Sequence, residues 1–262
     1  MNYSFLNLYA THWKDLQRMV EENYALSNDN RTVLLGSCAI HSVEYQREVM
    51  KFDENVVYQL EPLVKGHWHT IEHIIKNLEG AGEIWDYDLD NIQILKEYDI
   101  DAKFRPCLYT ESLKRIQNKQ EPTIDVLFVG SSTPYRAQFI HNLMTNERIF
   151  REINASFVFG CNFFGEKLDN LMADSKIILN LNPYEGECRQ QQTRIFYALI
   201  NNKCVLSQRC SRNYFDDLIE EFNTHSEIQE KIIDLLKDDK WRRYPHEDYK
   251  QYSKNLRNRF NI

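Results

Sequence analysis

Two patterns of hydrophobic and polar positions alternate along the chain. Short apolar runs end in glycine or other small residues, and most are followed by a segment with apolar residues at helical spacing. In the first half this pattern predicts strands at 32–36, 56–60, 83–85 and 103–106, with helices over 43–52, 70–78 and 89–98. Alternating strands and helices of this kind form a parallel sheet with helices on its faces.

A second series follows the polar stretch 111–123. We therefore predict two domains, 1–115 and 116–262, each a doubly wound, Rossmann-like α/β unit, and we expect the two to face each other across a cleft. Three further helices are expected after the last strand. The second series comprises strands at 124–130, 155–160, 176–181 and 204–207, helices over 135–144, 166–173 and 191–201, and tail helices over 214–222, 226–237 and 246–259.

Composition excludes several classes of protein. The chain has 262 residues, 42% of them hydrophobic, and a formal net charge of −7. No apolar run reaches the roughly 18 residues of a spanning helix, and the start lacks a signal-peptide pattern, so we expect no membrane span and a cytoplasmic location. An acidic balance also disfavours indiscriminate nucleic-acid binding. The cysteines are scattered without CxxC pairs, which indicates reduced thiols and no metal site; they are Cys38, Cys107, Cys161, Cys188, Cys204 and Cys210.

Ligands of parallel α/β sheets bind beyond the carboxyl ends of the strands, so the residues that follow each strand are the candidate site residues. After the strand 124–130, a turn of small residues opens a helix: Gly130, Ser131, Ser132 and, one turn later, Arg136. Small side chains allow backbone N–H groups to approach a phosphate at a helix N-terminus. An ordinary strand–helix turn with a Ser or Thr N-cap is the competing interpretation.

The loop after the strand 176–181 carries a denser set of polar residues. Its carboxylates can accept sugar or ribose hydroxyls, and its arginines can pair with phosphate oxygens. A solvated loop with internal ion pairs is the alternative. The candidate residues are Glu185, Glu187, Arg189, Gln192 and Arg194.

In the first half, His41 follows the first strand, and Glu61 and His67 follow the second. A histidine or a carboxylate there can deprotonate an acceptor hydroxyl. A metal site at the HWH sequence around His67 lacks a third ligand. Asp88 follows the third strand as an expected helix N-cap. The chain has no GxGxxG, GxSxG, P-loop or HExxH motif, which disfavours dehydrogenase, hydrolase, NTPase and zinc-protease functions.

Three segments together resemble a known family: EIWDYDLDNIQIL, IDVLFVGSSTPYRAQFIHNL and DSKIILNLNPYEGECRQQQTRIFYALINNKCVLSQ. They look like the nucleotide-sugar glycosyltransferases of the GT-B fold, in particular the compact bacterial and phage, spore-protein-like members of group 1. The resemblance covers about 32–260. It departs from the family at Tyr197, where a glutamate is frequent, and at Asn201 and Asn202, where a turn of small residues is usual.

The resemblance implies a transferase that moves a sugar from a nucleoside diphosphate, such as UDP, to a hydroxyl acceptor without a metal ion or other cofactor. The second domain would hold the donor, with its phosphates near the Gly130 turn, Arg136, Arg189 and Arg194. The first would hold the acceptor, with the last helix crossing back to it. If transfer inverts the anomeric centre, Glu61, His41 or His67, in that order, would be the base. Retention needs none.

Several alternatives remain open at this point. The acceptor is a surface glycan, as the net charge favours, or a hydroxymethylated DNA base, which would need a basic channel such as Arg209, Arg212, 240–243 and 254–259 could supply. A solvated helix face is the simpler explanation of those charges. The chain could also be a non-catalytic nucleotide-sugar-binding module or a nucleotide-sugar epimerase.

Overall fold

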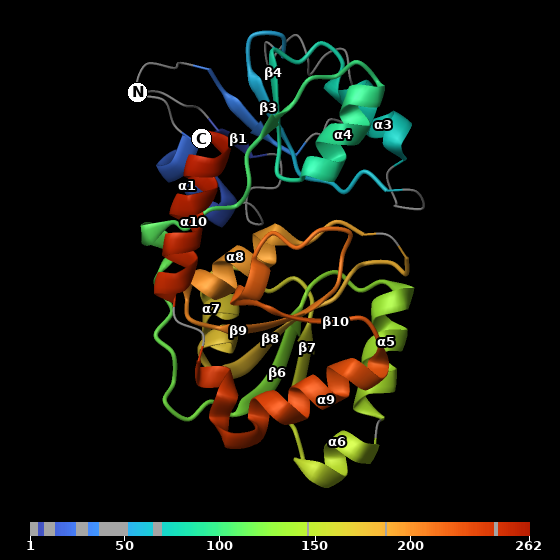
Figure 1. Cartoon of the computed structure of the whole chain (residues 1–262), viewed down its shortest axis with the longest axis vertical. Coiled ribbons are helices and arrows are strands. Elements are labelled where there is room, and N and C mark those ends of the chain that lie inside the picture. The colour runs from blue at the N-terminus through green and yellow to red at the C-terminus, as the bar shows by residue number, and fades with distance from the viewer. Residues whose placement is uncertain are drawn as a thin grey trace. The chain divides into compact units, whose positions relative to one another are not determined.

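The structure is a computed structural model that describes residues 5–7, 14–24, 31–36, 52–64, 70–145, 147–186, 188–243 and 246–262. The chain divides into two compact units: unit 1 is Met1–Thr110 with Leu256–Ile262, and unit 2 is Glu111–Asn255. Each unit contains a parallel sheet of five strands (Figure 1). The expected α/β class, with two parallel sheets, is therefore confirmed.

The strands described in unit 1 lie in the order of the sequence, β1-β2-β3-β4-β5. The order of these described strands does not reverse, so they are not doubly wound, contrary to the expectation for the first half. Apolar runs predict which segments form strands, but they do not specify on which side of a strand the next one is added. The elements are β1 (Phe5–Asn7), α1 (Lys14–Tyr24), β2 (Val33–Leu35), β3 (Val56–Gln59), α3 (Ile71–Leu78), β4 (Glu83–Asp86), α4 (Leu89–Glu97) and β5 (Lys103–Phe104).

Two helices of unit 1 begin at side-chain caps. The Thr70 hydroxyl accepts the N–H of His73 at 3.2 Å. The Asp88 carboxylate accepts the N–H groups of Asp90 and Asn91 at 2.9 and 3.0 Å. These bonds satisfy N–H groups that have no partner within the helix, so the predicted N-cap role of Asp88 is confirmed. The helix expected over 43–52 falls outside the described residues except for Phe52, which lies in a turn.

The sheet of unit 2 has the order β10-β9-β8-β6-β7. After β7 the chain returns to the other side of β6, so unit 2 is doubly wound, with its switch point between β6 and β8. The elements are η2 (Glu111–Leu113), β6 (Ile124–Val129), α5 (Pro134–Met144), α6 (Glu147–Glu152), β7 (Phe157–Gly160), α7 (Glu166–Ala173), β8 (Ser175–Asn180), α8 (Gln192–Ile200), β9 (Cys204–Gln208), η3 (Asp216–Leu218), β10 (Glu220–Phe222), α9 (His225–Leu236), η4 (Lys237–Arg242) and α10 (His246–Phe260).

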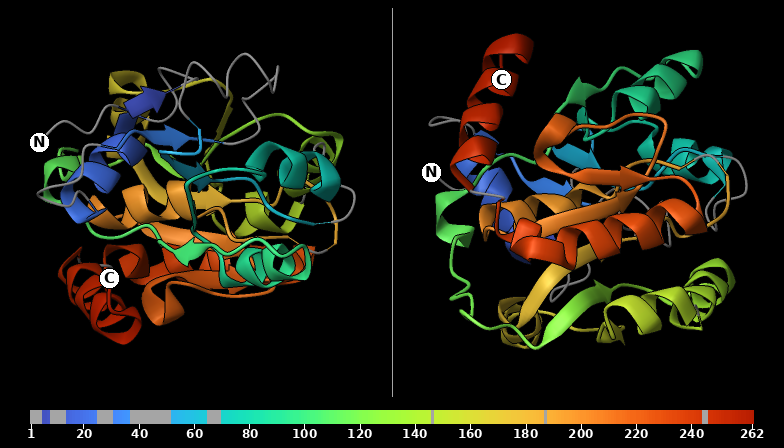
Figure 2. Two further views of the ribbon diagram at one scale, coloured as in Figure 1. Left: turned by 90° about the horizontal axis from the view of Figure 1, so that it is seen from above. Right: turned by 60° about the horizontal axis from the view of Figure 1, so that its bottom comes forward.

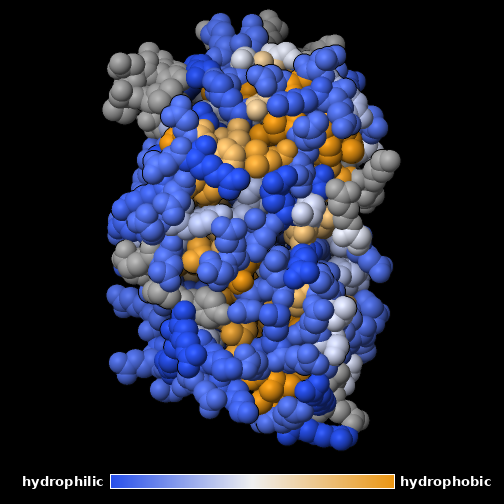
Figure 3. All heavy atoms as spheres, viewed as in Figure 1, coloured by the Kyte–Doolittle hydropathy of each residue, from blue (hydrophilic) through white to orange (hydrophobic). Residues whose placement is uncertain are grey.

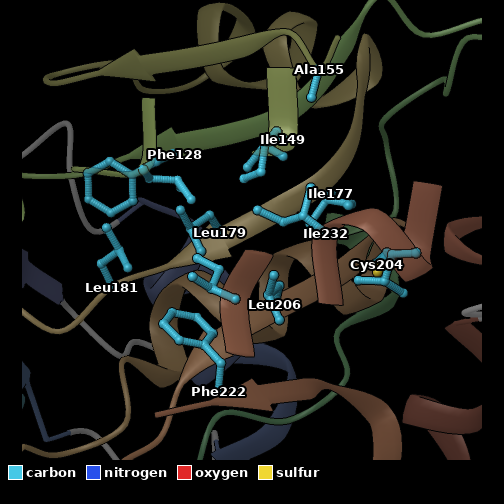
Figure 4. Close-up of a cluster of buried hydrophobic side chains, with 14 of the residues drawn as sticks. Phe128, Ile149, Ala155, Ile177, Leu179, Leu181, Cys204, Leu206, Phe222 and Ile232 are labelled. Carbon is cyan, nitrogen blue, oxygen red and sulfur yellow. The ribbon is translucent and has the colours of Figure 1, made fainter. Parts of the chain in front are cut away.

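Alternate residues of the strands form the main core of unit 2. Val126 and Phe128 of β6 point to the same face of the sheet as Ile177 and Leu179 of β8, as the two-residue period of a strand requires. On this face they pack against α5, α6 and α9 (Figure 4). The helices α7 and α8 lie on the other face (Figure 2). At the surface, the face seen in Figure 3 is largely hydrophilic, and its apolar residues gather in separate patches.

The helix predicted over 214–222 is wrong. The segment instead forms η3 and the edge strand β10, which pairs in parallel with β9 (Glu220 opposite Leu206). Asn213 stops a helix because its side chain accepts the N–H of Phe215 at 2.8 Å and donates to the carbonyl of Asp216 at 3.0 Å. Asp216 then adopts a positive φ of 47°. Local side-chain bonds of this kind compete with helical ones.

Asn201 joins the start of unit 2 to the end of α8. Its Oδ1 accepts the N–H groups of Arg115 and Ile116 at 3.0 and 2.9 Å, and its Nδ2 donates to the carbonyls of Leu113 and Tyr197 at 3.1 and 2.9 Å. The side chain is almost fully buried. Asn201 stands where the resembled family usually has a turn of small residues, and it fixes the segment 113–116 to α8.

Candidate functional site

The turn that follows β6 is tied to the loop that follows β8. Thr133 caps α5 by accepting the N–H of Arg136 at 3.2 Å, and its hydroxyl donates to the carbonyl of Pro183 at 2.6 Å. Gly130 donates to the carbonyl of Gly160, at the end of β7, at 3.0 Å. The carboxyl ends of three neighbouring strands therefore meet around this turn, at the switch point of the sheet.

Arg136 is buried and held at every nitrogen of its guanidinium group. Nε and Nη2 donate to the carbonyl of Leu181 at 3.2 and 2.7 Å, and Nη1 donates to the carbonyl and hydroxyl of Ser131 at 3.0 and 2.8 Å. Burial lowers the pKa of Arg136 to about 10. The guanidinium group remains charged at neutral pH, and its position is fixed by the protein itself.

Arg194, in the first turn of α8, is held by one hydrogen bond, from Nη1 to the side-chain oxygen of Asn180. Asn180 ends β8 and is oriented by a second bond, from its Nδ2 to the hydroxyl of Ser207 at 2.9 Å. Burial lowers the pKa of Arg194 to about 9, and the nearby charge of Arg136 acts in the same direction. Across the described ranges, neither arginine forms an ion pair with a carboxylate.

Gly130 leaves room for both guanidinium groups. A Cβ atom at this position would lie 2.8 Å from Nη2 of Arg194, 2.9 Å from Cζ of Phe128 and 3.5 Å from Nη1 of Arg136. Any side chain here would therefore displace Arg194 or the Phe128 ring. The glycine is needed for this close approach and not for an unusual backbone angle.

The charge and geometry of this region suit an anion. Two desolvated guanidinium groups without a carboxylate partner lie beside the N-terminus of α5, whose free N–H groups add positive potential. Ser131 and Ser132, both exposed, line the same turn with small side chains. The chemistry suits phosphate oxygens, which guanidinium groups bind with charge-assisted hydrogen bonds.

The loop after β8 places its predicted residues differently. Glu185 is exposed. Burial raises the pKa of the Tyr135 hydroxyl, and the negative charge of Glu185 raises it further. Arg189 is only 2% exposed and donates to the Ser211 hydroxyl at 3.2 Å, toward the loop that follows β9. Gln192 is buried in the first turn of α8. Glu187 lies outside the described residues.

Tyr197, at the position where the resembled family often has a glutamate, faces α7. Its hydroxyl donates to Oδ1 of Asp169, and the Arg115 guanidinium lies 5.1 Å from its ring centroid. Arg115 is also paired with Asp169, with Nε and Oδ2 2.9 Å apart. The tyrosine therefore belongs to a packed cluster beside the segment that Asn201 holds.

In unit 1, Glu61 follows β3 at the carboxyl edge of the sheet and is half-buried. Its backbone is held on both sides: its N–H donates to Oε1 of Gln59 at 2.7 Å, and its carbonyl accepts Nδ2 of Asn91 at 3.0 Å. Asn91 also accepts the N–H of Leu63 at 2.9 Å. The position of the Glu61 loop is thus fixed by α4. His41 and His67 fall outside the described part of the chain.

The sequence did not point to Phe128, whose ring contacts both arginines, or to Asn180, which accepts a hydrogen bond from Arg194. Phe128 lies within an apolar run, where nothing separates it from a core residue. Asn180 had a signal, because it is a polar residue that ends the very apolar run KIIL. For the ranges described, no group of three or more His, Cys, Asp or Glu side chains could hold a metal ion. Nor does any helix there have the length and apolar character needed to cross a membrane.

No protein-family model matches the chain. It is 27% identical over 138 residues to the uncharacterized protein R358 of Acanthamoeba polyphaga mimivirus, a match that covers 53% of this chain and 45% of that protein. Among solved structures it resembles S. aureus TarM, determined as a point mutant in complex with Fondaparinux, alpha-GlcNAc-glycerol and UDP. That match has a TM-score of 0.56 at 12% identity over 87% of this chain and 52% of TarM.

A second solved structure, the GtfA/B complex, matches with a TM-score of 0.52 at 11% identity over 92% of this chain and 57% of that chain. The chain therefore spans only about half the length of R358, TarM and the matched chain of the GtfA/B complex. Both solved structures are glycosyltransferases of the GT-B fold. With its two α/β units and their parallel sheets, the chain has the fold of the GT-B glycosyltransferases.

Proposed function

We propose that the chain is a glycosyltransferase that transfers a sugar from a nucleoside diphosphate to a hydroxyl acceptor. One observation carries the proposal: the buried guanidinium group of Arg136 and the half-buried Arg194, neither paired with a described carboxylate, lie at the switch point of a doubly wound sheet. A diphosphate would supply the missing negative charge. The likeness to TarM, whose structure contains UDP, supports a nucleotide as the ligand.

In the proposed reaction the acceptor oxygen forms a bond to the anomeric carbon, and the bond from that carbon to the phosphate oxygen breaks. The diphosphate leaves with the electron pair of that bond. Arg194 and Arg136, with the N–H groups of the Gly130 turn, stabilise the developing charge, a task that needs no metal ion. If the anomeric centre inverts, Glu61 accepts the proton of the acceptor hydroxyl.

A glycan is the acceptor we favour over DNA. Three of the basic residues of the C-terminal region that could form a DNA channel are paired with acidic neighbours. Lys240 forms an ion pair with Asp234. Nε of Arg242 lies 3.4 Å from Oδ2 of Asp239, and Nε of Arg209 lies 3.7 Å from Oε2 of Glu221. Paired charges of this kind contribute little to the attraction of a polyanion. We propose a cytoplasmic location, where the five described cysteines, which form no disulfide with one another, would stay reduced.

A ligand screen tests the proposal directly. The melting temperature of the purified protein is measured with UDP, GDP, ADP, CDP and dTDP and with their common sugar conjugates, with and without Mg²⁺. We expect one nucleoside diphosphate to raise the melting temperature without metal, and calorimetry to give a dissociation constant. Absence of stabilisation by any of them would overturn the proposed donor site. Incubation of that donor with a glycan extract then tests transfer.

A further inference from the structure

Unit 2 contains a hollow that is lined by neither Arg136 nor Arg194. It has a volume of about 330 Å³, within the range of small-molecule sites. Its wall is one face of α10, where Asp248, Tyr252 and Asn255 follow one another at helical spacing. The opposite wall includes Leu199, near the carboxyl end of α8, whereas Arg194 lies in the first turn of that helix.

The apolar part of the hollow consists of two tyrosines and two leucines, Tyr249, Tyr252, Leu199 and Leu218. Tyr249 is almost fully buried and packs against Phe215, with ring centroids 5.8 Å apart. Tyr252 is half-buried and lies beside it on α10. Tyrosine rings offer a flat apolar surface with a polar tip, which suits a ligand that has an apolar face and many hydroxyl groups.

The polar part consists of planar groups with unused hydrogen-bonding capacity. Nε2 of Gln251 donates to Oδ1 of Asn255 at 3.1 Å, which leaves Oε1 of Gln251 as an acceptor and Nδ2 of Asn255 as a donor. Asp217 and Asp248 add carboxylate oxygens, and Arg243 adds donors. None of these three charged side chains forms an ion pair in the described structure.

The charges of the lining select among ligand classes. Two carboxylates against one guanidinium give a net charge of −1, which opposes phosphate-rich ligands such as nucleotides or nucleic acid. A carboxylate can accept hydrogen bonds from two neighbouring hydroxyl groups, and an amide can accept from one hydroxyl group and donate to another. A neutral ligand rich in hydroxyl groups satisfies both requirements.

We propose that this hollow binds a neutral oligosaccharide. Tyr252 supplies the surface on which a sugar ring lies, and Gln251, Asn255, Asp217 and Asp248 bind its hydroxyl groups. If the chain is the proposed transferase, the oligosaccharide is its acceptor, and this assignment rests on the proposed function. The binding of the oligosaccharide is independent of that function, because it involves no donor and no transfer.

The test measures binding of maltotetraose, cellotetraose and chitotetraose to the full chain, by saturation-transfer NMR and calorimetry. We expect at least one to bind, and Gln251→Ala and Tyr252→Ala each to weaken binding by about 5- to 10-fold, the effect of losing one or two contacts. Gln138→Ala is the matched control, since Gln138 donates to Asn142 at 2.8 Å in the same i, i+4 arrangement on α5, where it lines neither site.

Arg194→Ala separates this proposal from the donor site, because it should weaken nucleoside diphosphate binding and leave oligosaccharide binding unchanged. Binding of none of the three oligosaccharides at millimolar concentration would overturn the inference. So would equal binding by the wild type and by Gln251→Ala and Asp248→Asn, two exposed positions whose substitution should not prevent folding.

Discussion

The guanidinium groups of Arg136 and Arg194 both lie over the ring of Phe128, at 5.3 and 5.4 Å from its centroid. Two positive charges therefore contact one aromatic ring, and the ring quadrupole attracts each of them. No carboxylate of the described residues offsets their mutual repulsion, which a bound anion would relieve. Arg136 is fixed by the backbone, so Arg194 is the group free to adjust to a ligand.

Arg194→Ala should weaken binding of a nucleoside diphosphate by about 10- to 100-fold, because a charge-assisted bond to phosphate is lost. The melting temperature of the unliganded variant should not fall, since one of two repelling charges is removed. Arg148→Ala, an exposed arginine paired with Glu152, serves as control. Calorimetry measures both variants, and unchanged affinity in Arg194→Ala would refute its role.

Gly130→Ala should abolish most donor binding, because the added Cβ displaces the Arg194 side chain or the Phe128 ring. We expect a loss of stability of about 1–3 kcal/mol from this overpacking. Gly82→Ala in unit 1 is the comparison, as its Cβ would lie 2.3 Å from the carbonyl oxygen of Asp53. Urea unfolding and calorimetry should show both variants destabilised but only Gly130→Ala impaired in binding to the remaining folded protein.

Stability should decrease below about pH 6.5 because of His225. Its ring stacks on Phe139 at 3.9 Å between centroids, and its buried Nδ1 has no hydrogen-bond partner. Burial lowers the pKa of His225 below that of the unfolded chain, so the unfolded state binds the proton first and unfolding is favoured as pH falls through the unfolded value.

His225→Phe keeps the stack and removes the proton. The difference in melting temperature between this variant and the wild type should widen from pH 7.5 to pH 5.5. A constant difference would show that the imidazole does not contribute to the acid sensitivity.

Asn201→Ala should lower the free energy of unfolding of unit 2 by about 2–4 kcal/mol, because the half-buried N–H groups of Arg115 and Ile116 and the buried carbonyl of Leu113 lose their partner. Asn142→Ala removes an exposed asparagine and should change it by less than about 0.5 kcal/mol. Equilibrium urea unfolding distinguishes the two, and equal effects would contradict the role given to Asn201.

Glu61→Gln should leave donor affinity unchanged and lower the rate of transfer, because the amide cannot accept the acceptor proton. Its backbone bonds to Gln59 and Asn91 do not involve the substituted carboxylate. Steady-state kinetics at several pH values provide the measurement. Wild-type activity in this variant would indicate retention of the anomeric centre or a different base.

The segments of regular structure were largely predictable because apolar runs and cap residues are local signals. The strand expected at 124–130 is observed as Ile124–Val129, and the turn after it ends at the N-cap Thr133. Strand order was not predictable, since it depends on pairings between distant segments. The same holds for 214–222, whose helical spacing of apolar residues is overridden by Asn213 and by pairing with β9.

The site was predictable by position and not by role. The residues after β6 and β8 do include the two arginines, because the sheet rule locates ligands at strand ends. The sequence could not reveal that Arg136 bonds to Leu181 and Ser131 while Arg194 bonds to Asn180 alone. That distinction depends on the distance between side chains from two helices, which no local pattern encodes.

The order in which the chain is synthesised gives the two units different folding histories. Unit 2 is one continuous segment, whereas unit 1 includes Leu256–Ile262, which come after the whole of unit 2. Within unit 1, Arg257 bonds to Asn23 and the ring of Phe260 packs edge-on against Phe104, with centroids 4.8 Å apart. Unit 2 can therefore complete its core first on the ribosome, and unit 1, although made first, acquires these contacts last.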